Sequence, residues 1–502
     1  MINVPEHPKY KYPYIGYNLR HRAFDLTNFN EKPRPEMSEQ ILPVFTAQQR
    51  HKTVLRNATA TDRVQRLQKL RIAIESREEK IFAALQNDLR KSRFESALAE
   101  IYFVYAEIDH AIKNIATWMA PRKVGRTLSN GLADSYIHME PKGNTLILSP
   151  WNYPFQLAAG PLVSAIAAGN TAILKPSEHS AETSACLTEL ISETFAPEEI
   201  FCVQGDADTA IALLQLPFDH IFFTGSTAVG KKIMAAAAEH LSSVTLELGG
   251  KSPCVISGSA NLEKAARKIA WGKLVNSGQT CIAPDHVYVH ESQLERFITA
   301  YREAARALFF LDEEQINAGS YARMINHNHF NRQQELLDDA LAQGAMLAWG
   351  GNSHAASLTF FPALLTGVPD HSRLMQEEVF GPLLPVLTYK SMDEAAAAIN
   401  SRPAPLALYF FGQNKSETAV FLKTCPSGGA CVNDVLVHIS NPALPFGGRG
   451  PSGMGSSHGL AGFRAFSHER SVMYQSVFNT TRFAYPPYAR KTGLLNWLKK
   501  IM

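Results

Sequence analysis

The sequence predicts an α/β protein organised around a doubly wound parallel sheet, and three observations lead to this prediction. Short apolar segments alternate with stretches of helical periodicity between residues 144 and 248. No residue from 143 to 174 is charged, which is typical of parallel strands that are covered on both faces. Polar residues and glycines follow the apolar segments, at the strand ends where such sheets bind ligands.

The alternation predicts five strands, at 145–149, 171–175, 200–204, 220–225 and 243–248. The helices between them end at Ala168, run from 181 to 195, lie near 209–214 and run from 227 to 240. The uncharged run is long enough to suggest a membrane span. Because its prolines and asparagines divide it into a strand, a small-residue helix and a second strand, we interpret it as the buried centre of the sheet.

A long helix is expected before this sheet and a second α/β region after it. Residues 1–41 carry Tyr and Pro without periodicity, and we treat them as an extension of unknown role. From 63 to 119 the pattern predicts one long amphipathic helix that serves packing. Its apolar residues recur at spacings of three and four, namely Leu98, Ile101, Val104, Ile108, Ile112, Ile115 and Trp118. The second α/β pattern runs from Lys251 to about Cys431.

Composition excludes several classes of protein. A chain of 502 residues with 45% hydrophobic and 19% charged residues is globular, and its length suggests two to four domains. A net charge of +3 without a basic stripe argues against nucleic-acid binding. The six cysteines form no CxxC pair, and the N-terminus lacks the apolar core of a secretory signal. We therefore expect a cytoplasmic protein.

The segment "NSGQTCIAPDHV" places Cys281 behind a small polar run and ahead of a strand-like segment. Structural cysteines usually lie among apolar residues, as Cys254 does in "KSPCVI". Cys281 is therefore a candidate nucleophile, held by a turn at the edge of a cleft. We interpret the small residues before it as giving substrate and cofactor access to the thiol, with packing second.

Two glycine motifs invite comparison with nucleotide-binding loops. Gly448, Gly450 and Gly453 match G-x-G-x-x-G, but Pro451 lies inside the motif and no strand-then-helix context surrounds it, so we reject it. "GSTAVGKK" at 225–232 lacks the Ser or Thr that a triphosphate loop needs after its lysine. It still predicts a glycine turn into a helix N-terminus, which can hold a diphosphate or be only a tight turn.

Two other strand ends carry polar side chains. Glu247 in "TLELGGKSP" can serve as a general base if burial raises its pKa, although most such glutamates are solvated or salt-bridged. Asn152 in "SPWNYPF" can donate to an oxyanion or can be a turn residue. No Cys or carboxylate joins the histidines in a ligand pattern, so we predict no metal site at His286, His290, His327 and His329.

Together, these strand-end groups resemble those of the aldehyde dehydrogenase superfamily. The resemblance is carried by "SPWNYPF", "LKPSE", "FFTGSTAVGKKI", "LELGGKSP", "NSGQTC" and "EEVFGP", and it spans about residues 42 to 480. "NIATWMAPRKV", "LPFGGRGPSGMGSSHG" and "YPPY" look most similar to the class 3 and fatty aldehyde dehydrogenase branch. This branch commonly has Tyr before the His of "SSHG", where this chain has Ser457.

The resemblance implies a mechanism. Cys281 would attack the aldehyde carbon, Asn152 and the Cys281 backbone N–H would form the oxyanion hole, and Glu247 would activate the water that hydrolyses the thioester. The implied substrate pocket is aromatic and suits an apolar, medium- or long-chain or aromatic aldehyde; it is formed by Tyr153, Trp271, Phe446 and His458.

The resemblance also implies how the cofactor binds. Lys175 and Glu178 would hold the adenosine ribose, Gly225 and Ser226 the diphosphate, Glu378 and Phe380 the nicotinamide riboside, and Trp151 would line the cleft. Because Glu178 repels a 2′-phosphate and accepts from a 2′-hydroxyl, we expect NAD to be preferred, with NADP also accepted as in this branch.

The implied architecture is an NAD(P)-binding domain at 42–249 with a bridging hairpin near 123–141, and a catalytic domain at 250–435. Residues 436–480 would return to the cofactor domain and supply a bridging strand, 481–502 would form a tail, and the enzyme would be a homodimer. Rival interpretations are an acylating dehydrogenase or acyl-phosphate reductase of the same fold, and a non-catalytic scaffold protein.

The tail "ARKTGLLNWLKKIM" places Leu494, Leu498 and Ile501 on one helical face beside four cations. It could lie on a membrane surface, which would make the protein peripheral to membranes, or dock as a cap over the substrate entrance. We favour docking.

Overall fold

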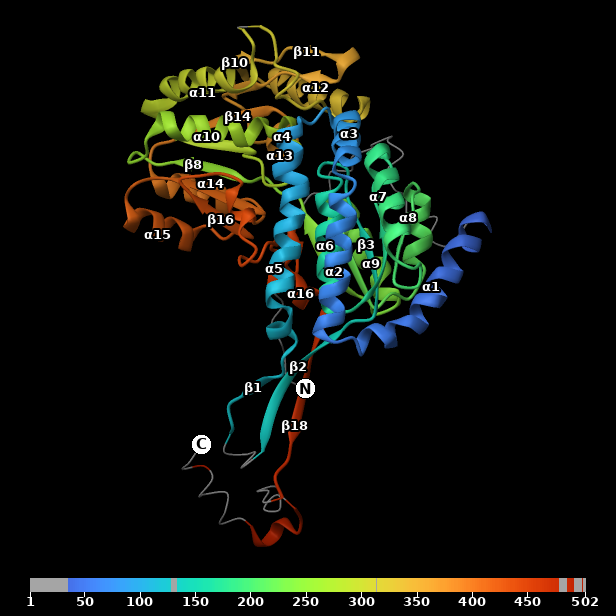
Figure 1. Ribbon diagram of the computed structural model, residues 1–502. Coiled ribbons are helices and arrows are strands. Elements are labelled where there is room, and N and C mark those ends of the chain that lie inside the picture. Colours follow the sequence, from blue (N-terminus) through green and yellow to red (C-terminus); the bar gives the residue numbers. More distant parts are fainter. Residues whose placement is uncertain (1–34, 128–132, 313, 478–484, 492–498, 500–502) are drawn as a thin grey trace, which may run out of the picture. The chain divides into compact units, whose positions relative to one another are not determined.

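Six strands form the sheet that the sequence predicts between residues 144 and 248. In the computed structural model, which describes residues 35–127, 133–312, 314–477, 485–491 and 499 (Figure 1), their order is β17-β7-β6-β3-β4-β5. The five predicted strands are parallel, and β17 joins the edge antiparallel, opposite Glu247. Their bounds are β3 Asn144–Leu148, β4 Thr171–Lys175, β5 Ile200–Cys202, β6 His220–Gly225, β7 Ser243–Leu248 and β17 Gly453–Met454. The predicted fold class is confirmed.

The strand order reverses at β3, and this reversal positions the candidate site. From β3 the chain moves outward to β4 and β5, then returns to β6 on the other side of β3. Right-handed crossovers therefore place the two pairs of connecting helices on opposite faces and open a crevice at the carboxyl ends of β3 and β6. The connecting helices are α6 Gln156–Ala168, α7 Ala181–Thr194, α8 Ala207–Leu214 and α9 Thr227–Glu239.

The single long helix predicted from 63 to 119 is wrong, because the chain breaks it into several pieces. Arg90 adopts a left-handed conformation (φ 54°) that ends α3, and a π-helix, η2, then shifts the register. Leu98 is consequently 55% exposed, whereas Val104 and Ile108 are buried. The pieces are α2 Ala60–Glu75, α3 Glu78–Leu89, α4 Arg93–Ser96, η2 Ala97–Ile101 and α5 Tyr102–Met119. A further helix, α1 (Pro35–Arg56), begins inside the segment expected to be an extension to residue 41.

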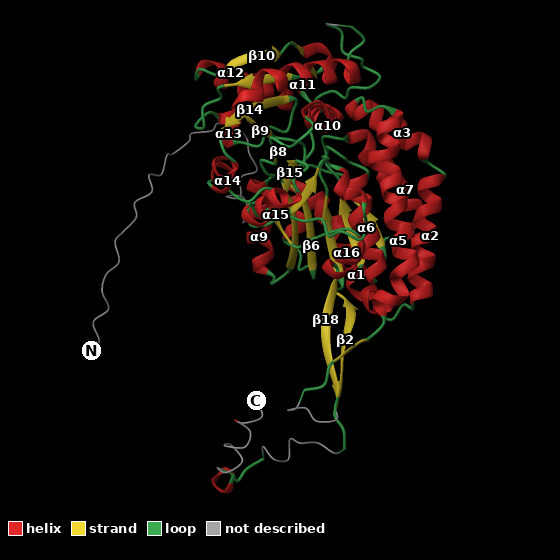
Figure 2. Cartoon of the chain, turned by 90° about the vertical axis from the view of Figure 1, so that its left-hand side faces the viewer, coloured by secondary structure: helices red, strands yellow, loops and turns green. Residues whose placement is uncertain are grey.

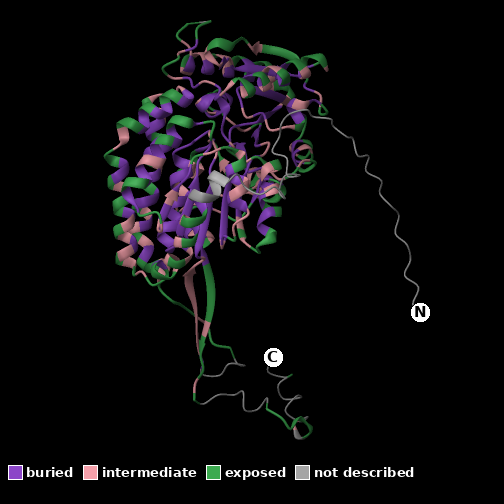
Figure 3. Cartoon of the chain, turned by 90° about the vertical axis from the view of Figure 1, so that its right-hand side faces the viewer, coloured by how far each residue is buried: buried purple, intermediate pink, exposed green. Residues whose placement is uncertain are grey.

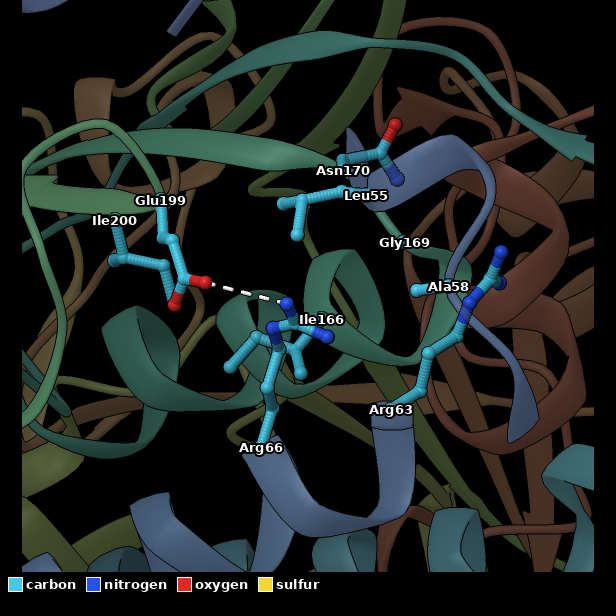
Figure 4. Close-up of a pocket in the computed structure, with 9 residues that line it drawn as sticks. All are labelled: Leu55, Ala58, Arg63, Arg66, Ile166, Gly169, Asn170, Glu199 and Ile200. Carbon is cyan, nitrogen blue, oxygen red and sulfur yellow. Dashed lines mark hydrogen bonds and ion pairs between the residues drawn. The ribbon is translucent and has the colours of Figure 1, made fainter. Parts of the chain in front are cut away.

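Buried side chains concentrate in the strands and on the inner faces of the helices (Figure 3). Figure 4 shows a contact region between α2 and the end of α6. The buried Arg63 guanidinium donates to the Ala167 and Ala168 carbonyl oxygens at 3.1 and 2.7 Å, and Arg66 pairs with Glu199 at 3.2 Å. Because the last carbonyls of a helix lack intrahelical partners, Arg63 caps α6 and ties α2 to it.

A second sheet of seven strands follows in the order β10-β13-β14-β9-β8-β15-β16, parallel except for β10. Its strands are β8 Pro253–Ile256, β9 His286–His290, β10 Met346–Gly350, β13 Ala363–Thr366, β14 Leu383–Tyr389, β15 Ala407–Phe411 and β16 Gly429–Val432. Its helices are α10 Leu262–Leu274, α11 Leu294–Phe309, α12 His327–Ala342, α13 Arg373–Gln376, α14 Met392–Asn400 and α15 Lys415–Thr424 (Figure 2). A separate pair is formed by β11 Ser353–His354 and β12 Thr359–Phe360.

The third sheet joins segments far apart in the sequence. β1 (Arg122–Val124), β2 (Asp134–Pro141) and β18 (Ser467–Tyr474) pair antiparallel, and β18 follows the helix α16 (Gly459–Ala465). β2 and β18 extend side by side beyond the two larger sheets (Figures 1 and 2). The domain boundaries given above stay a prediction.

The predicted tail at 481–502 lies mostly outside the described residues, which include only 485–491 and 499 of it. A short 3₁₀ turn, η9 (Tyr488–Arg490), is the element described there. Across the part of the chain that the structure describes, every helix is too short or too polar to span a bilayer.

Candidate active site

One apolar cavity of about 360 Å³ contains the thiol and the carboxylate that the sequence marks as catalytic. Cys281 follows a 3₁₀ turn, η4 (Val275–Gly278), and Glu247 lies near the end of β7. The four residues expected at the substrate mouth line the same cavity: Tyr153, Trp271, Phe446 and His458. Most of the other lining side chains are apolar, so the thiol and the carboxylate face a largely water-excluding space.

The turn before Cys281 is strained and tightly packed. Asn276, Ser277 and Gly278 all have positive φ, at 51°, 53° and 75°. A Cβ at Gly278 would come within 2.3 Å of the Gly381 carbonyl oxygen, so only glycine fits there. Asn276 and Gln279 are fully buried. The expectation that this run serves access before packing is therefore wrong: buried hydrogen bonds hold the run in place.

Asn152 is attached directly to this turn. Its Nδ2 donates to the Gln279 carbonyl oxygen at 2.9 Å, and its own carbonyl oxygen accepts from Asn276 Nδ2 at 2.8 Å. These two hydrogen bonds link the segment after β3 to the residues just before Cys281. One of the two Nδ2 hydrogens is used in this way, and the Asn152 side chain is buried.

The environment of Cys281 favours the neutral thiol. Burial raises the pKa of Cys281, and the nearby carboxyl groups of Glu378 and Glu247 raise it further. No lysine or arginine lines the described cavity. The described cavity lining therefore supplies no positive charge that would lower the pKa of this thiol.

One carboxyl oxygen of Glu247 accepts a hydrogen bond from the described residues and the other does not. The Ser457 hydroxyl donates to Oε1 at 3.1 Å, while Oε2 is buried and has no hydrogen-bond partner among the described residues. Burial raises the pKa of Glu247 well above its ordinary value, and the Ser457 hydrogen bond opposes this shift. A carboxyl group with these properties can exchange a proton near neutral pH.

A buried ion pair beneath Asn152 was not found by the sequence reasoning. Lys91 and Glu100 are completely buried, and Lys91 Nζ lies 2.6 Å from Glu100 Oε1. Lys91 also donates to the Asn152 carbonyl oxygen at 3.1 Å, and Glu100 Oε2 accepts from the backbone N–H groups of Phe155 and Gln156 at 3.1 and 2.8 Å. The pair holds both ends of the segment that carries Asn152.

The residues expected to bind the diphosphate and to line the cleft lie at the carboxyl ends of β3 and β6, the two strands between which the strand order reverses. Trp151 follows β3, while Gly225 ends β6 and Ser226 stands between β6 and α9. Ser226 is the N-cap of α9 and accepts from the Val229 N–H at 3.3 Å. A Cβ at Gly225 would lie 2.4 Å from the Phe223 ring, so the glycine leaves room for that ring. The first turn of α9 therefore presents backbone donors at the crevice.

Lys175 and Glu178 lie at the end of the next strand, β4. Lys175 Nζ lies 3.1 Å from Glu178 Oε2 and donates to the Pro176 carbonyl oxygen at 3.0 Å. The Lys175 side chain is buried, whereas that of Glu178 is 39% exposed. The buried Lys175 thus holds the Glu178 carboxylate in place, and this carboxylate remains accessible to solvent.

Glu378 and Phe380 approach the same crevice from the second sheet. A Cβ at Gly249 would lie 1.8 Å from Glu378 Oε2, so the glycine leaves space for this carboxyl group. Burial and the charge of Asp285 raise the pKa of Glu378 to about 8, and its Oε1 is buried without a hydrogen-bond partner among the described residues. Phe380 has a φ of 47° and lies against Trp151, with ring centroids 5.4 Å apart.

The Glu378 segment is held by side chains that the sequence did not single out. Lys251 Nζ donates to the Glu377 carbonyl oxygen at 2.8 Å and lies 2.5 Å from Asp285 Oδ1. Arg332 Nη2 donates to the Glu378 carbonyl oxygen at 2.6 Å. Strained residues persist only where their surroundings hold them, which explains how Phe380 keeps its positive φ.

His286 and His329, two of the four histidines considered in the sequence, make contacts within the fold. His329 packs against Trp151 with centroids 4.5 Å apart, and burial lowers its pKa to about 4. His286 lies 3.2 Å from Asp285. Within the described ranges, no three His, Cys, Asp or Glu side chains gather as metal ligands.

Comparison with known proteins agrees with this geometry. Residues 36–472 match the model of the aldehyde dehydrogenase family. The chain is 42% identical to the 4,4'-diaponeurosporen-aldehyde dehydrogenase of Staphylococcus aureus (strain NCTC 8325 / PS 47), over 86% of this chain and 92% of the relative. It is 41% identical to the dimeric NADP-preferring aldehyde dehydrogenase of Rattus norvegicus, over 86% and 94% of the two chains.

Among solved structures, the substrate-bound state of AldH from Staphylococcus aureus superposes with a TM-score of 0.87 at 40% identity, covering 91% of this chain and 99% of that one. The family match and the identity to these relatives place the chain in the aldehyde dehydrogenase family: it is an oxidoreductase that oxidises an aldehyde with NAD or NADP.

Proposed function

We propose that the cavity is the active site and that the protein converts an apolar aldehyde to its carboxylic acid through a thioester on Cys281. The observation that carries this proposal is that Cys281 and Glu247 face one apolar cavity while Asn152 is hydrogen-bonded to the turn that presents the thiol. A nucleophile, an oxyanion donor and a base are the three groups that this reaction needs.

In the first half of the reaction, the Cys281 thiol loses its proton to water, its sulfur bonds to the aldehyde carbon and the carbonyl oxygen becomes an oxyanion. The second hydrogen of Asn152 Nδ2 and the backbone N–H of Cys281 donate to that oxygen. When the aldehyde carbon loses its hydrogen as a hydride, the C=O bond forms again and a thioester results. Bound NAD or NADP contributes one chemical property here, the capacity to accept a hydride. In the second half, Glu247 takes a proton from water, the water oxygen bonds to the thioester carbon, and the Cys281 sulfur leaves.

The cofactor site fits the residues present. Glu378 offers a buried oxygen without a partner beside the space that Gly249 leaves, α9 offers backbone donors, and Glu178 offers an exposed carboxylate. We propose that Ser226 and the first turn of α9 hold the diphosphate, that Lys175 and Glu178 hold the adenosine ribose, and that Glu378 with Phe380 holds the nicotinamide end.

Replacing Glu178 tests the proposed preference for NAD. Because the carboxylate repels a 2′-phosphate, we expect Glu178→Gln to raise kcat/KM with NADP relative to NAD by about tenfold, as one charge interaction is worth about 1–2 kcal/mol in such a site. Steady-state rates with both cofactors measure this ratio. Glu182→Gln, which removes a carboxylate from the first turn of the following helix, serves as a control. An unchanged ratio in Glu178→Gln would remove Glu178 from cofactor selection.

Replacing Glu247 tests the hydrolytic half of the mechanism. Glu247→Gln cannot take a proton from water, so we expect a burst of NADH close to the enzyme concentration followed by a steady rate at least a hundredfold slower. Stopped-flow absorbance records both phases. A steady rate equal to that of the wild type would mean that another group is the base.

The same experiment separates the rival reactions. An acylating dehydrogenase passes its thioester to coenzyme A and an acyl-phosphate reductase to phosphate, and neither needs a water-activating carboxylate. The buried Glu247 beside the cavity therefore favours hydrolysis over both. A scaffold protein would show no NADH formation with any aldehyde in a panel of short, long-chain and aromatic substrates.

The substrate class follows from the cavity lining. Aromatic and aliphatic side chains surround Cys281, and such surfaces bind apolar ligands by excluding water. The matched Staphylococcus relative is named for an aldehyde of this apolar kind. We therefore propose medium- or long-chain or aromatic aldehydes as substrates.

We further propose that the protein is a cytoplasmic homodimer. One matched relative is named as dimeric, and β18 is an edge strand with mostly exposed side chains that can add to a partner's sheet. For the tail we propose docking near the substrate entrance, with weak membrane attachment as the alternative, from its sequence alone.

A further inference from the structure

The Ser457 hydroxyl lies between two acceptors and has one proton to give. Its Oγ is 3.1 Å from Glu247 Oε1 and 3.2 Å from the Phe446 carbonyl oxygen. Because a hydroxyl has one hydrogen to donate, this hydrogen bond goes either to Glu247 or to the Phe446 carbonyl oxygen, or is divided between the two acceptors. Ser457 and Phe446 both line the cavity that contains Cys281.

The backbone around Ser457 is held on both sides, so the hydroxyl can move while the chain does not. The Ser457 N–H donates to the Phe446 carbonyl oxygen at 2.6 Å, and the Phe446 N–H donates back to the Ser457 carbonyl oxygen at 3.1 Å. Two residues later, the Gly459 N–H donates to the buried Glu107 Oε2 at 2.9 Å. Between these contacts His458 is kept at a φ of 70°.

We propose that Ser457 is the positioning residue for Glu247: its hydroxyl donates to Oε1 while the carboxylate is charged and is shared between Oε1 and the Phe446 carbonyl oxygen when the carboxyl group is protonated. This inference rests on the proposed role of Glu247 as the base. Holding Oε1 leaves Oε2, the oxygen without a partner, as the one that receives the proton of the attacking water.

The physical reason lies in the charge of the acceptor. A hydrogen bond to a charged carboxylate is about twice as strong as one to a neutral carbonyl, so ionised Glu247 draws the hydroxyl. Once Glu247 is protonated, Oε1 is a neutral acceptor and the Phe446 carbonyl competes equally. The hydroxyl thereby stabilises the basic form of Glu247 against burial and releases it after proton transfer.

The other groups facing Glu247 do not provide this stabilisation. The titratable side chains that share the described cavity lining are Tyr153, Cys281 and His458. Burial raises the pKa values of Tyr153 and Cys281 and lowers that of His458 to about 4, so all three are neutral near pH 7. In the acyl-enzyme Cys281 carries the acyl group and cannot ionise.

The test is the pH dependence of the steady rate under conditions where hydrolysis limits turnover. Removing the hydrogen bond with Ser457→Ala raises the pKa of Glu247, so the base is charged only at higher pH. We expect the midpoint of the kcat profile to move up by about one pH unit and kcat at pH 7 to fall about tenfold. The amplitude of the NADH burst and kcat/KM should change little, because Ser457 does not act on acylation, and KM should therefore fall together with kcat.

Two variants and a control sharpen the measurement. Ser457→Thr keeps the hydroxyl and should restore the wild-type midpoint, while Ser457→Cys, with a weak S–H donor, should lie between Ala and Thr and serves if the Ala protein does not fold. Ser440→Ala removes a hydroxyl from the same cavity lining that donates to the Val437 carbonyl oxygen, and it should leave the midpoint unchanged.

The outcomes distinguish this inference from the proposed function. If Glu247→Gln blocks hydrolysis but Ser457→Ala leaves the pH midpoint in place, the inference fails and the mechanism stands. If Ser457→Ala and Ser440→Ala shift the midpoint equally, Ser457 acts only through cavity packing and the inference also fails. If Glu247→Gln retains the full steady rate, the proposed base is wrong, whatever Ser457 does.

Discussion

Cys281→Ser is expected to reduce aldehyde oxidation by at least about a thousandfold while leaving cofactor affinity close to that of the wild type, since a hydroxyl is far less readily ionised than a thiol and is the poorer nucleophile. The proposed cofactor contacts come from other segments: the ends of β4 and β6, and the loop around Glu378. NADH absorbance measures turnover, and quenching of tryptophan fluorescence by NAD measures affinity.

Cys431→Ser is the matched control for this experiment. Cys431 lies on β16, is also partly exposed, and does not line the cavity. Its replacement should leave turnover unchanged. Near-normal turnover in Cys281→Ser would exclude the thioester mechanism, and equal loss in both variants would show that the protein tolerates no loss of a thiol.

Breaking the buried ion pair is expected to have the largest effect on stability. Lys91→Met leaves the Glu100 carboxylate uncompensated in a site with no solvent exposure, and such a change costs about 3–5 kcal/mol in the free energy of unfolding. Burial raises the pKa of Glu100 and Lys91 opposes this effect, so without Lys91 the carboxyl group will take up a proton. The variant should therefore lose less stability at pH 5 than at pH 8.

The urea midpoint at each pH measures this loss. Lys80→Met is the matched control, because Lys80 forms an equally short ion pair with Glu189 on the surface and should contribute little. Lys91→Met combined with Glu100→Gln should regain part of the lost stability. A loss in Lys91→Met no greater than that in Lys80→Met would contradict the idea that this pair supports the Asn152 segment.

The residue pattern alone was sufficient for the five parallel strands of the first sheet and for several of their ends, but not for the antiparallel edge strand β17. Apolar runs bounded by polar residues determined the strands at 171–175, 220–225 and 243–248 to the residue. Parallel strands end at one edge of a sheet, so Asn152, Ser226 and Glu247 could be grouped before any coordinates were known. Their functional assignment needed the family resemblance, because each has an ordinary structural explanation on its own.

Periodicity failed where local geometry departs from a regular helix. The π-helix at 97–101 adds a residue per turn, and the left-handed Arg90 ends α3, so Leu98 leaves the face that its spacing predicts. Neither feature has a composition that distinguishes it from a continuous amphipathic helix. The turn before Cys281 was misjudged for a similar reason, since small polar residues look accessible until their buried partners are seen.

The sequence by itself determined the fold class, most of the strand ends and the polar groups that stand there, because these depend on residues near one another in the chain. Only the tertiary structure decided which side chains set the properties of those groups. Ser457 meets Glu247 across 210 residues, and Lys91 meets the Asn152 carbonyl across 61. Such contacts follow from packing between elements, which leaves no periodic signal in the sequence, and packing determines which carboxyl groups are buried and therefore which pKa values are raised.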